Sequence, residues 1–183
     1  YALGVGSLNT VAVGGLAIGT SNQANGGGVT ALAIGLGNVT TGGFGVTLGV
    51  GNRSSATAAV AIGTANTASG NTAIAMGRQS TASGQTSIAL GNVATANQTS
   101  AIAIGHSTQA TATGTIAIGG GTGSGSTNLD ATAASASAAN AVAIGTNAEA
   151  VGASSLALGD ASRGTGINGS AFGASAQANA DNS

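Results

Sequence analysis

The residues that could carry acid–base or redox chemistry are few in this chain. Its 183 residues include one histidine, His106, and no cysteine. Histidine is the side chain whose ordinary pKa suits proton transfer near neutral pH, but His106 directly follows Gly105, at a turn position that other repeats fill with Arg78, Asn92 or Asp160. We therefore expect His106 to be exposed to solvent. Because no nucleophile and orienting group can be assembled around it, we predict that the protein is not an enzyme.

The acidic residues do not form a predicted metal site either. Asp130, Glu149, Asp160 and Asp181 lie at different offsets within the repeat described below, so they do not stack into the oxygen-rich cage that calcium needs. The glycine runs at 26–28 and 119–121 lack the Gly-Lys-Ser/Thr of a phosphate-binding loop. We predict no catalytic, cofactor-binding or metal-binding residue.

Composition excludes several other classes of protein. The chain has 34 Gly, no Pro and no Trp, yet 42% of its residues are hydrophobic, so it is not the polar, highly charged kind that stays disordered. Three Arg, no Lys and 2% aromatic residues offer no basic stripe and too few stacking platforms for nucleic acid. The apolar runs are far shorter than the ~20 residues of a membrane-spanning helix.

A repeat of 14 residues organises most of the sequence. Each repeat ends in two branched or long apolar residues around a small one, followed by glycine, as in Val60-Ala61-Ile62-Gly63. Upstream, we align Gly4 and Gly19 with this series at spacings of 15 and 16. The closing glycines that keep the 14-residue phase are Gly35, Gly49, Gly63, Gly77, Gly91, Gly105 and Gly119, and then Gly145, Gly159 and Gly173.

The repeat predicts an all-β fold. Alternation of large and small residues is typical of a strand, with both large residues on one face, and the Gly, Asn, Ser and Thr that follow favour turns. A unit this short cannot bury its own apolar edge, so successive units must stack as a parallel β-solenoid of about twelve turns. We expect Ala, Ile, Val and Leu to fill its interior, and one face to pack on other chains in an oligomer.

We predict a single domain over residues 1–183. Looser N-terminal turns cover 1–35, regular repeats 36–119, an insertion about 120–139, and further repeats 140–183. Glu149 and Arg163 both lie four residues past a repeat glycine, so the phase stacks opposite charges on adjacent turns. The alternative is that they are two unrelated surface charges.

Two segments, 71–80 and 154–162, resemble the head repeats of YadA-like trimeric autotransporter adhesins. The resemblance implies a left-handed parallel β-roll assembled as a homotrimer on the outer membrane of a Gram-negative bacterium, held by a C-terminal anchor that this chain lacks. It implies attachment to host extracellular matrix, such as collagen, fibronectin or laminin, or to cell-surface receptors. The alternative is a structural spacer, or a self-association module, without a host ligand.

In that family an Asn-Ser-Val-Ala-Ile-Gly-x-x-Ser pattern is linked to collagen binding, and here the pattern is degenerate. Residues 140–148 lack both serines, and residues 154–162 have serine in place of asparagine. Alternatively, the pattern is only the structural consensus of the roll. We also expect binding through the outer face of stacked turns or through a loop at 124–139. The candidate ligand-binding residues are Asn71, Ser80, Asn140, Ser154, Ser155 and Ser162.

Overall fold

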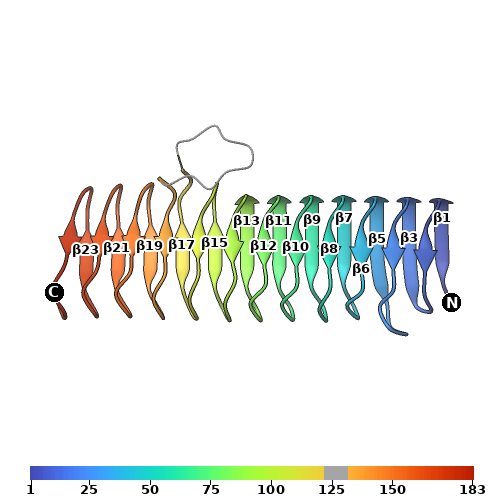
Figure 1. The fold of residues 1–183 in the computed structure, drawn as a ribbon, viewed down its shortest axis with the longest axis horizontal. Helices are drawn as coiled ribbons and strands as arrows, with labels where there is room; N and C mark the ends of the chain where they lie inside the picture. Colours follow the sequence, from blue (N-terminus) through green and yellow to red (C-terminus); the bar gives the residue numbers. More distant parts are fainter. Residues whose placement is uncertain (122–131) are drawn as a thin grey trace. The chain divides into compact units, whose positions relative to one another are not determined.

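The computed structural model describes residues 1–121 and 132–183, and these contain strands and turns but no helix. They divide into two compact units, residues 1–86 (unit 1) and 87–183 (unit 2). In each unit the chain alternates between a longer and a shorter strand, joined by tight turns (Figure 1). One longer and one shorter strand make one turn of the solenoid, and each unit has six turns. The predicted parallel β-solenoid of about twelve turns is therefore confirmed.

The longer strands of unit 1 are β1 (Leu3–Ser7), β3 (Gly15–Thr20), β5 (Ala31–Leu36), β7 (Val46–Val50), β9 (Val60–Thr64) and β11 (Ile74–Arg78). Its shorter strands are β2 (Thr10–Val11), β4 (Gln23–Ala24), β6 (Val39–Thr40), β8 (Arg53–Ser54), β10 (Thr67–Ala68) and β12 (Thr81–Ala82). Within the unit, the longer strands pair in parallel as the first sheet and the shorter strands as the second sheet.

Unit 2 repeats this arrangement. Its longer strands are β13 (Ile88–Asn92), β15 (Ile102–Ile104), β17 (Ile116–Ile118), β19 (Val142–Ile144), β21 (Leu156–Leu158) and β23 (Ser170–Phe172). Its shorter strands are β14 (Thr95–Ala96), β16 (Gln109–Ala110), β18 (Ser135–Ala136), β20 (Glu149–Ala150), β22 (Arg163–Gly164) and β24 (Gln177–Ala178).

The strands around the expected insertion keep the repeat in phase. Strand β17 pairs with β19, with Ile116 opposite Val142 and Ile118 opposite Ile144. Strand β18 falls within the segment 120–139 that we expected to be inserted, and it pairs with both β16 and β20. Residues 122–131 of that segment, and with them the whole first half of the expected loop at 124–139, lie outside the described residues.

The register of the first turn differs from the sequence alignment. Gly6, not Gly4, lies opposite Gly19, and Gly4 lies opposite Ala17. The alignment on Gly4 is therefore wrong by two residues. Backbone conformation explains why Gly6 pairs with Gly19. Gly6 has φ 109° and Gly19 has φ 116°, a conformation that glycine adopts much more readily than other residues.

The interior of the solenoid is made of small side chains. In the first sheet Ala17, Ala33, Ala61 and Ala75 are fully buried, and in the second sheet residues such as Ala68 are buried against them. The large aliphatic residues on either side of each Ala point outward, because successive side chains of a strand face opposite ways. Our expectation that Ile, Val and Leu fill the interior was thus wrong. The two sheets lie so close together that the space between them is filled by alanine.

A ladder of buried asparagines runs along unit 1, where each longer strand turns toward the shorter one. It consists of Asn22, Asn38, Asn52 and Asn66, all fully buried. In each step the amide Nδ2 of one asparagine donates to the Oδ1 of the preceding one, at 3.0–3.2 Å counting Asn9 as the first acceptor. The same amide groups donate to backbone carbonyls of their own and the next turn, as Asn52 does to Leu48 and Gly63. Part-buried carbonyls of the first sheet thus accept hydrogen bonds from a side chain.

Candidate functional site

The outer face of the second sheet carries polar side chains in both units. In unit 1 its strands place Thr10, Gln23, Val39, Arg53, Thr67 and Thr81 in one column, each opposite its neighbour in the register. The residue that follows each of these in its strand faces the interior; five of these six are Ala, Ser or Thr. The outward column therefore varies in chemistry from turn to turn, while the residue behind it stays small.

The corresponding column in unit 2 holds the one ion pair between described residues. Strand pairing places Glu149 opposite Arg163, and Arg163 opposite Gln177. The Nε of Arg163 lies 3.2 Å from the Oε2 of Glu149, with about half of each side chain exposed. The predicted stacking of these two charges is confirmed. Because the pair is exposed to water, it contributes little to stability, and its charges remain accessible to a partner.

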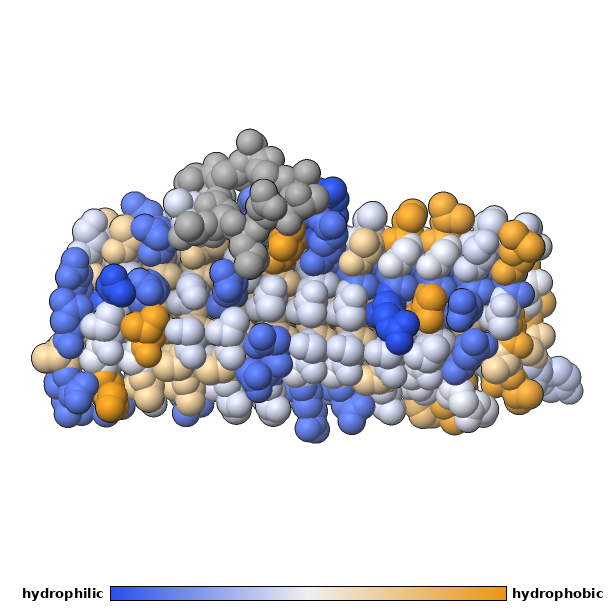
Figure 2. All heavy atoms as spheres, viewed as in Figure 1, coloured by the Kyte–Doolittle hydropathy of each residue, from blue (hydrophilic) through white to orange (hydrophobic). Residues whose placement is uncertain are grey.

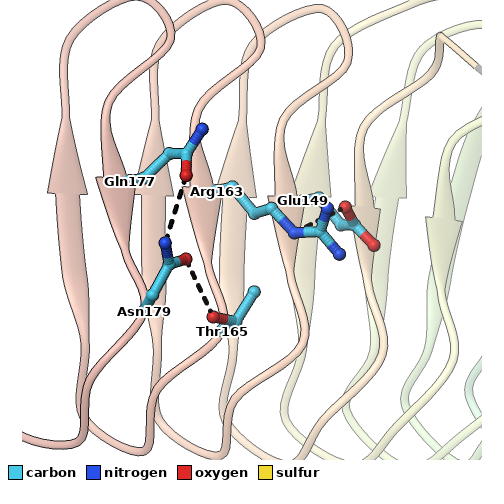
Figure 3. A network of polar contacts seen from close by, with 5 residues as sticks. All are labelled: Glu149, Arg163, Thr165, Gln177 and Asn179. Atoms are coloured by element: carbon cyan, nitrogen blue, oxygen red, sulfur yellow. Dashed lines mark hydrogen bonds and ion pairs between the residues drawn. The ribbon is translucent and has the colours of Figure 1, made fainter.

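Further polar contacts extend this surface over the last turns of unit 2 (Figure 3). The hydroxyl of Thr165 donates to the Oδ1 of Asn179 at 3.0 Å, and the Nδ2 of Asn179 donates to the Oε1 of Gln177 at 3.1 Å. We call Glu149, Arg163, Thr165, Gln177 and Asn179 the polar cluster. Its amide, hydroxyl and guanidinium groups offer both donors and acceptors, so it is suited to hydrogen bonding with the polar surface of another molecule.

The outer face of the first sheet has the opposite character. In unit 1, one column of outward side chains contains Leu32, Val46 and Val60, and the other contains Ile34, Leu48 and Ile62. In unit 2 the corresponding columns include Ile102, Ile116 and Val142, and Ile104, Ile118 and Ile144. These side chains are half-buried, and Leu48 is 42% exposed. Contiguous apolar faces of this kind are characteristic of association surfaces.

Three of the six predicted ligand-binding residues are exposed at turns that lead from a shorter strand to the next longer one. Asn71 lies in such a turn of unit 1, and Asn140 and Ser154 lie in such turns of unit 2. Asn140 and Ser154 occupy the same turn position, with φ 57° and 55°. Their backbone N–H groups donate to the carbonyls of Thr113 and Ala139, respectively. All three side chains could contact a partner.

The other three predicted residues are inside the solenoid. Ser80, Ser155 and Ser162 are at most 1% exposed. The backbone N–H of Ser80 donates to the Oδ1 of Asn66, and the hydroxyl of Ser162 donates to the carbonyl of Gly159. A macromolecular ligand cannot reach these hydroxyls, so their prediction as contact residues was wrong. Their burial favours the alternative reading, in which small side chains are part of the structural consensus of the roll; the hydroxyl of Ser162 bonds to turn backbone, whereas that of Ser155 is buried without a hydrogen-bond partner.

The residues considered for acid–base and metal chemistry do not come together. His106 is half-buried, so the expected exposure to solvent is partial. The Oδ1 of Asp181 accepts a hydrogen bond from the backbone N–H of Ile167, and Asp130 lies outside the described residues. Within residues 1–121 and 132–183 there is no group of three or more His, Cys, Asp or Glu that could hold a metal ion. The same residues contain no helix long and apolar enough to cross a membrane.

The repeat architecture, with its alanine interior and outward aliphatic columns, is matched by a known family model. The model of the YadA head domain repeat, which spans two copies, matches residues 54–80, 68–94, 82–105, 96–122, 131–162 and 165–183. The chain belongs to the YadA head family. These matches lie in both units, and the matched segments overlap by one repeat through residues 54–122, as stacked equivalent turns require. A search of curated proteins found no match.

Membership of the YadA head family confirms the resemblance seen in the repeats. The family consists of adhesin heads, which are displayed as surface-exposed passengers of autotransporters and are in general not enzymes. For this YadA head, the polar cluster on the second sheet and the aliphatic face of the first sheet are therefore the two surfaces whose roles need an explanation. Figure 2 shows one face of the molecule, on which polar colouring predominates over the C-terminal turns.

Proposed function

We propose that the chain is the head of a trimeric autotransporter adhesin of the bacterial surface, and that it attaches the cell to host extracellular matrix or host cells. The observation that carries this proposal is the contrast between the two outer faces within each unit. Aliphatic columns such as Leu32, Val46 and Val60 cover the first sheet, whereas the second sheet presents polar residues such as Thr67 and Thr81.

In this proposal the aliphatic face is buried in a homotrimer of left-handed rolls. Exposed aliphatic columns along a whole sheet would favour aggregation of a lone chain, and packing of the same face from three copies removes them from water. The polar face of the second sheet then remains on the outside. A ligand would contact several turns of it at once, and in a trimer three such faces add by avidity.

Sedimentation of the purified chain tests the assembly. We expect a trimer, and we expect Ile62→Glu, in the aliphatic column of β9, to dissociate it because the variant places a charge in the apolar interface. The matched control is Thr67→Glu, on the outer face of the adjacent strand β10, which should leave the trimer intact. A wild-type chain that is folded and monomeric would overturn the assembly.

A binding screen against collagen, fibronectin and laminin tests the adhesive role. The chain should bind at least one of them, and replacement of Arg163, Gln177 and Asn179 by alanine should weaken that binding. Thr64→Ala, at the exposed end of strand β9 in unit 1, serves as the control. A deletion restricted to residues 122–131 leaves β18 in place and separates the loop from the polar face. If binding is lost with this deletion and not with the triple variant, the polar face is not the ligand site.

A specific observation also favours the alternative role of a structural spacer. The outward column of the second sheet changes from Gln23 to Val39 to Arg53 in three successive turns, so no single chemical motif is repeated along it. A spacer or self-association module needs no such motif. Failure to bind any matrix protein or host cell, by a chain that is demonstrably trimeric, would favour this role over adhesion to the host.

A further inference from the structure

Three apolar side chains stand out on one edge of unit 1, at turns that lead from a shorter to a longer strand. Val13, Val29 and Phe44 lie in three consecutive turns of this kind and are 67%, 38% and 60% exposed. The position where a Cβ would lie on Gly14 is 3.0 Å from the carbonyl carbon of Val29, and the Cβ position of Gly43 faces the Cγ2 of Val29. The three turns are therefore neighbours, and we call these three residues the apolar ridge.

The backbone at Phe44 is unusual for so large a residue. Phe44 has φ 58°, a left-handed conformation in which bulky residues are rare. The equivalent turn positions of unit 1 hold Ala58, Thr72 and Thr86, which have φ 54–56°. Leu8 and Val93 share this conformation, with φ 57° and 61°, so the turns of the roll impose it on residues of many kinds. Phe44 differs in that it exposes a large apolar side chain, 60% accessible to solvent, where the next two turns place alanine and threonine. Such exposure indicates a contact outside the folded monomer.

The ridge protrudes rather than forming a groove. Gly27 and Gly28, which lengthen the turn before Val29, have no atom within 4 Å of their Cβ positions. Figure 2 shows hydrophobic spheres at the edges of the N-terminal turns on the right of the view. Even if each of the three side chains offered the ~150–250 Å² that a large aromatic residue buries, their total would stay below the roughly 800 Å² that each partner contributes to a stable protein interface. The ridge alone is therefore too small to hold a protein partner stably.

The charges of unit 1 indicate which partner suits a small convex apolar ridge. Residues 1–86 contain Arg53 and Arg78 and no acidic residue. Arg53 is exposed in β8, directly opposite Val39 of β6, the strand that precedes the turn of Phe44. Protruding apolar residues, a cation on the strand paired with the one that leads to Phe44 and the absence of acidic residues from 1–86 together suit an anionic lipid surface. The headgroups attract the cation and the interface accepts the apolar groups.

We propose that the apolar ridge of unit 1, assisted by Arg53, inserts into the interfacial region of an anionic lipid membrane. The association is peripheral and reversible, and it uses an edge of the roll rather than the polar cluster of unit 2. It is therefore independent of the matrix-binding proposal, and either can fail without the other.

Flotation of the full chain with lipid vesicles tests this inference. Binding is expected to vesicles of equal parts phosphatidylcholine and phosphatidylglycerol, and much less to phosphatidylcholine alone. Phe44→Asn should weaken partitioning roughly tenfold or more, because a side chain of this size contributes about that much on burial. Asparagine stands at the same turn position at 140, 168 and 182 and tolerates the left-handed conformation, so the variant should fold and melt at the same or a higher temperature.

Two further variants separate this mechanism from general stickiness. Arg53→Gln should weaken binding about fivefold on the anionic vesicles only, since a cation near such a surface contributes on that scale. Leu36→Asn removes an aliphatic side chain of similar exposure from the end of β5 and should change nothing. Absence of wild-type binding to anionic vesicles, or equal binding by Phe44→Asn, overturns the proposal. Loss of matrix-protein binding in Phe44→Asn, without vesicle binding by the wild type, would assign the ridge to a protein partner instead.

Discussion

The asparagine ladder makes a strong prediction about stability, and Asn52 is its best test. The Nδ2 of Asn52 donates to the Oδ1 of Asn38 at 3.1 Å, to the carbonyl of Leu48 at 3.0 Å and to the carbonyl of Gly63 at 2.7 Å. Its Oδ1 accepts from the backbone N–H and the Nδ2 of Asn66, both at 3.0 Å. The two amide hydrogens are shared among these three acceptors, so one fully buried side chain links five polar partners.

Asn52→Ala should lower the free energy of unfolding by about 3–5 kcal/mol. Each typical hydrogen bond contributes a net ~1 kcal/mol, and a buried donor or acceptor left without a partner costs about 1–3 kcal/mol. The backbone N–H of Asn66 and the carbonyl of Gly63 would both lose this partner, and alanine offers no polar atom in its place. Serine, which stands at the equivalent position 80, should have an intermediate effect.

Denaturant unfolding followed by circular dichroism measures the loss, and hydrogen exchange of the Asn66 amide measures it locally. The matched control is Asn71→Ala, an exposed asparagine in the same unit, for which we expect a change below about 0.5 kcal/mol. If Asn52→Ala costs no more than Asn71→Ala, or if the Asn66 amide keeps its protection, the ladder does not stabilise the roll.

Three further predictions concern single features of the fold. Gly49→Ala should destabilise by more than about 3 kcal/mol, because φ is 119° and a Cβ would collide with the carbonyl oxygen of Gly63; Gly51→Ala, with open space and φ 63°, should cost only about 1 kcal/mol. Glu149→Gln should change the unfolding free energy by less than about 1 kcal/mol, because the ion pair is exposed. The buried hydroxyls of Thr40 and Thr47 lie 2.6 Å apart. In a double-mutant cycle, Thr40→Val and Thr47→Val should each lower the free energy of unfolding by about 1 kcal/mol, and the double variant should be close to wild type.

The sequence predicted the strands and their register wherever the 14-residue phase holds, and it was wrong by two residues in the first turn, where the spacing is irregular. It did not predict which side of the strand faces inward. Alternation shows that Val60 and Ile62 share one face and that Ala61 lies on the other, and hydrophobicity alone favours the larger pair as core. The structure reverses this assignment, because the interior between the two sheets is filled by alanine. The residue between the two large apolar residues of each regular repeat, such as Ala61, is always small, and this regularity could have identified it as the one that faces the interior.

The candidate site was partly predictable for a related reason. Glu149 and Arg163 could be placed together because both lie at one offset of the repeat, and the structure pairs them. Polarity could not distinguish Ser154, exposed in a turn, from Ser155, buried beside it. The asparagine ladder was missed because asparagine is typical of turns. The signal was its recurrence at a fixed distance after the repeat glycine, as in Asn38 and Asn52.

Inward positions of this fold are constrained and outward positions of the second sheet are tolerant, so the fold can present different side chains to a partner without a change of backbone. The interior accepts only small or hydrogen-bonded side chains, such as Ala33, Thr47 and Asn52, so a large or unpaired inward residue is costly. The outward column of the second sheet accepts Gln23, Val39 and Arg53 in successive turns of the same backbone, so its side chains can change with little effect on folding. Among the turns of unit 1, Phe44 differs from Ala58 and Thr72 by exposing a large apolar side chain. Because folding does not select such a side chain at an exposed turn, we expect a specific interaction there.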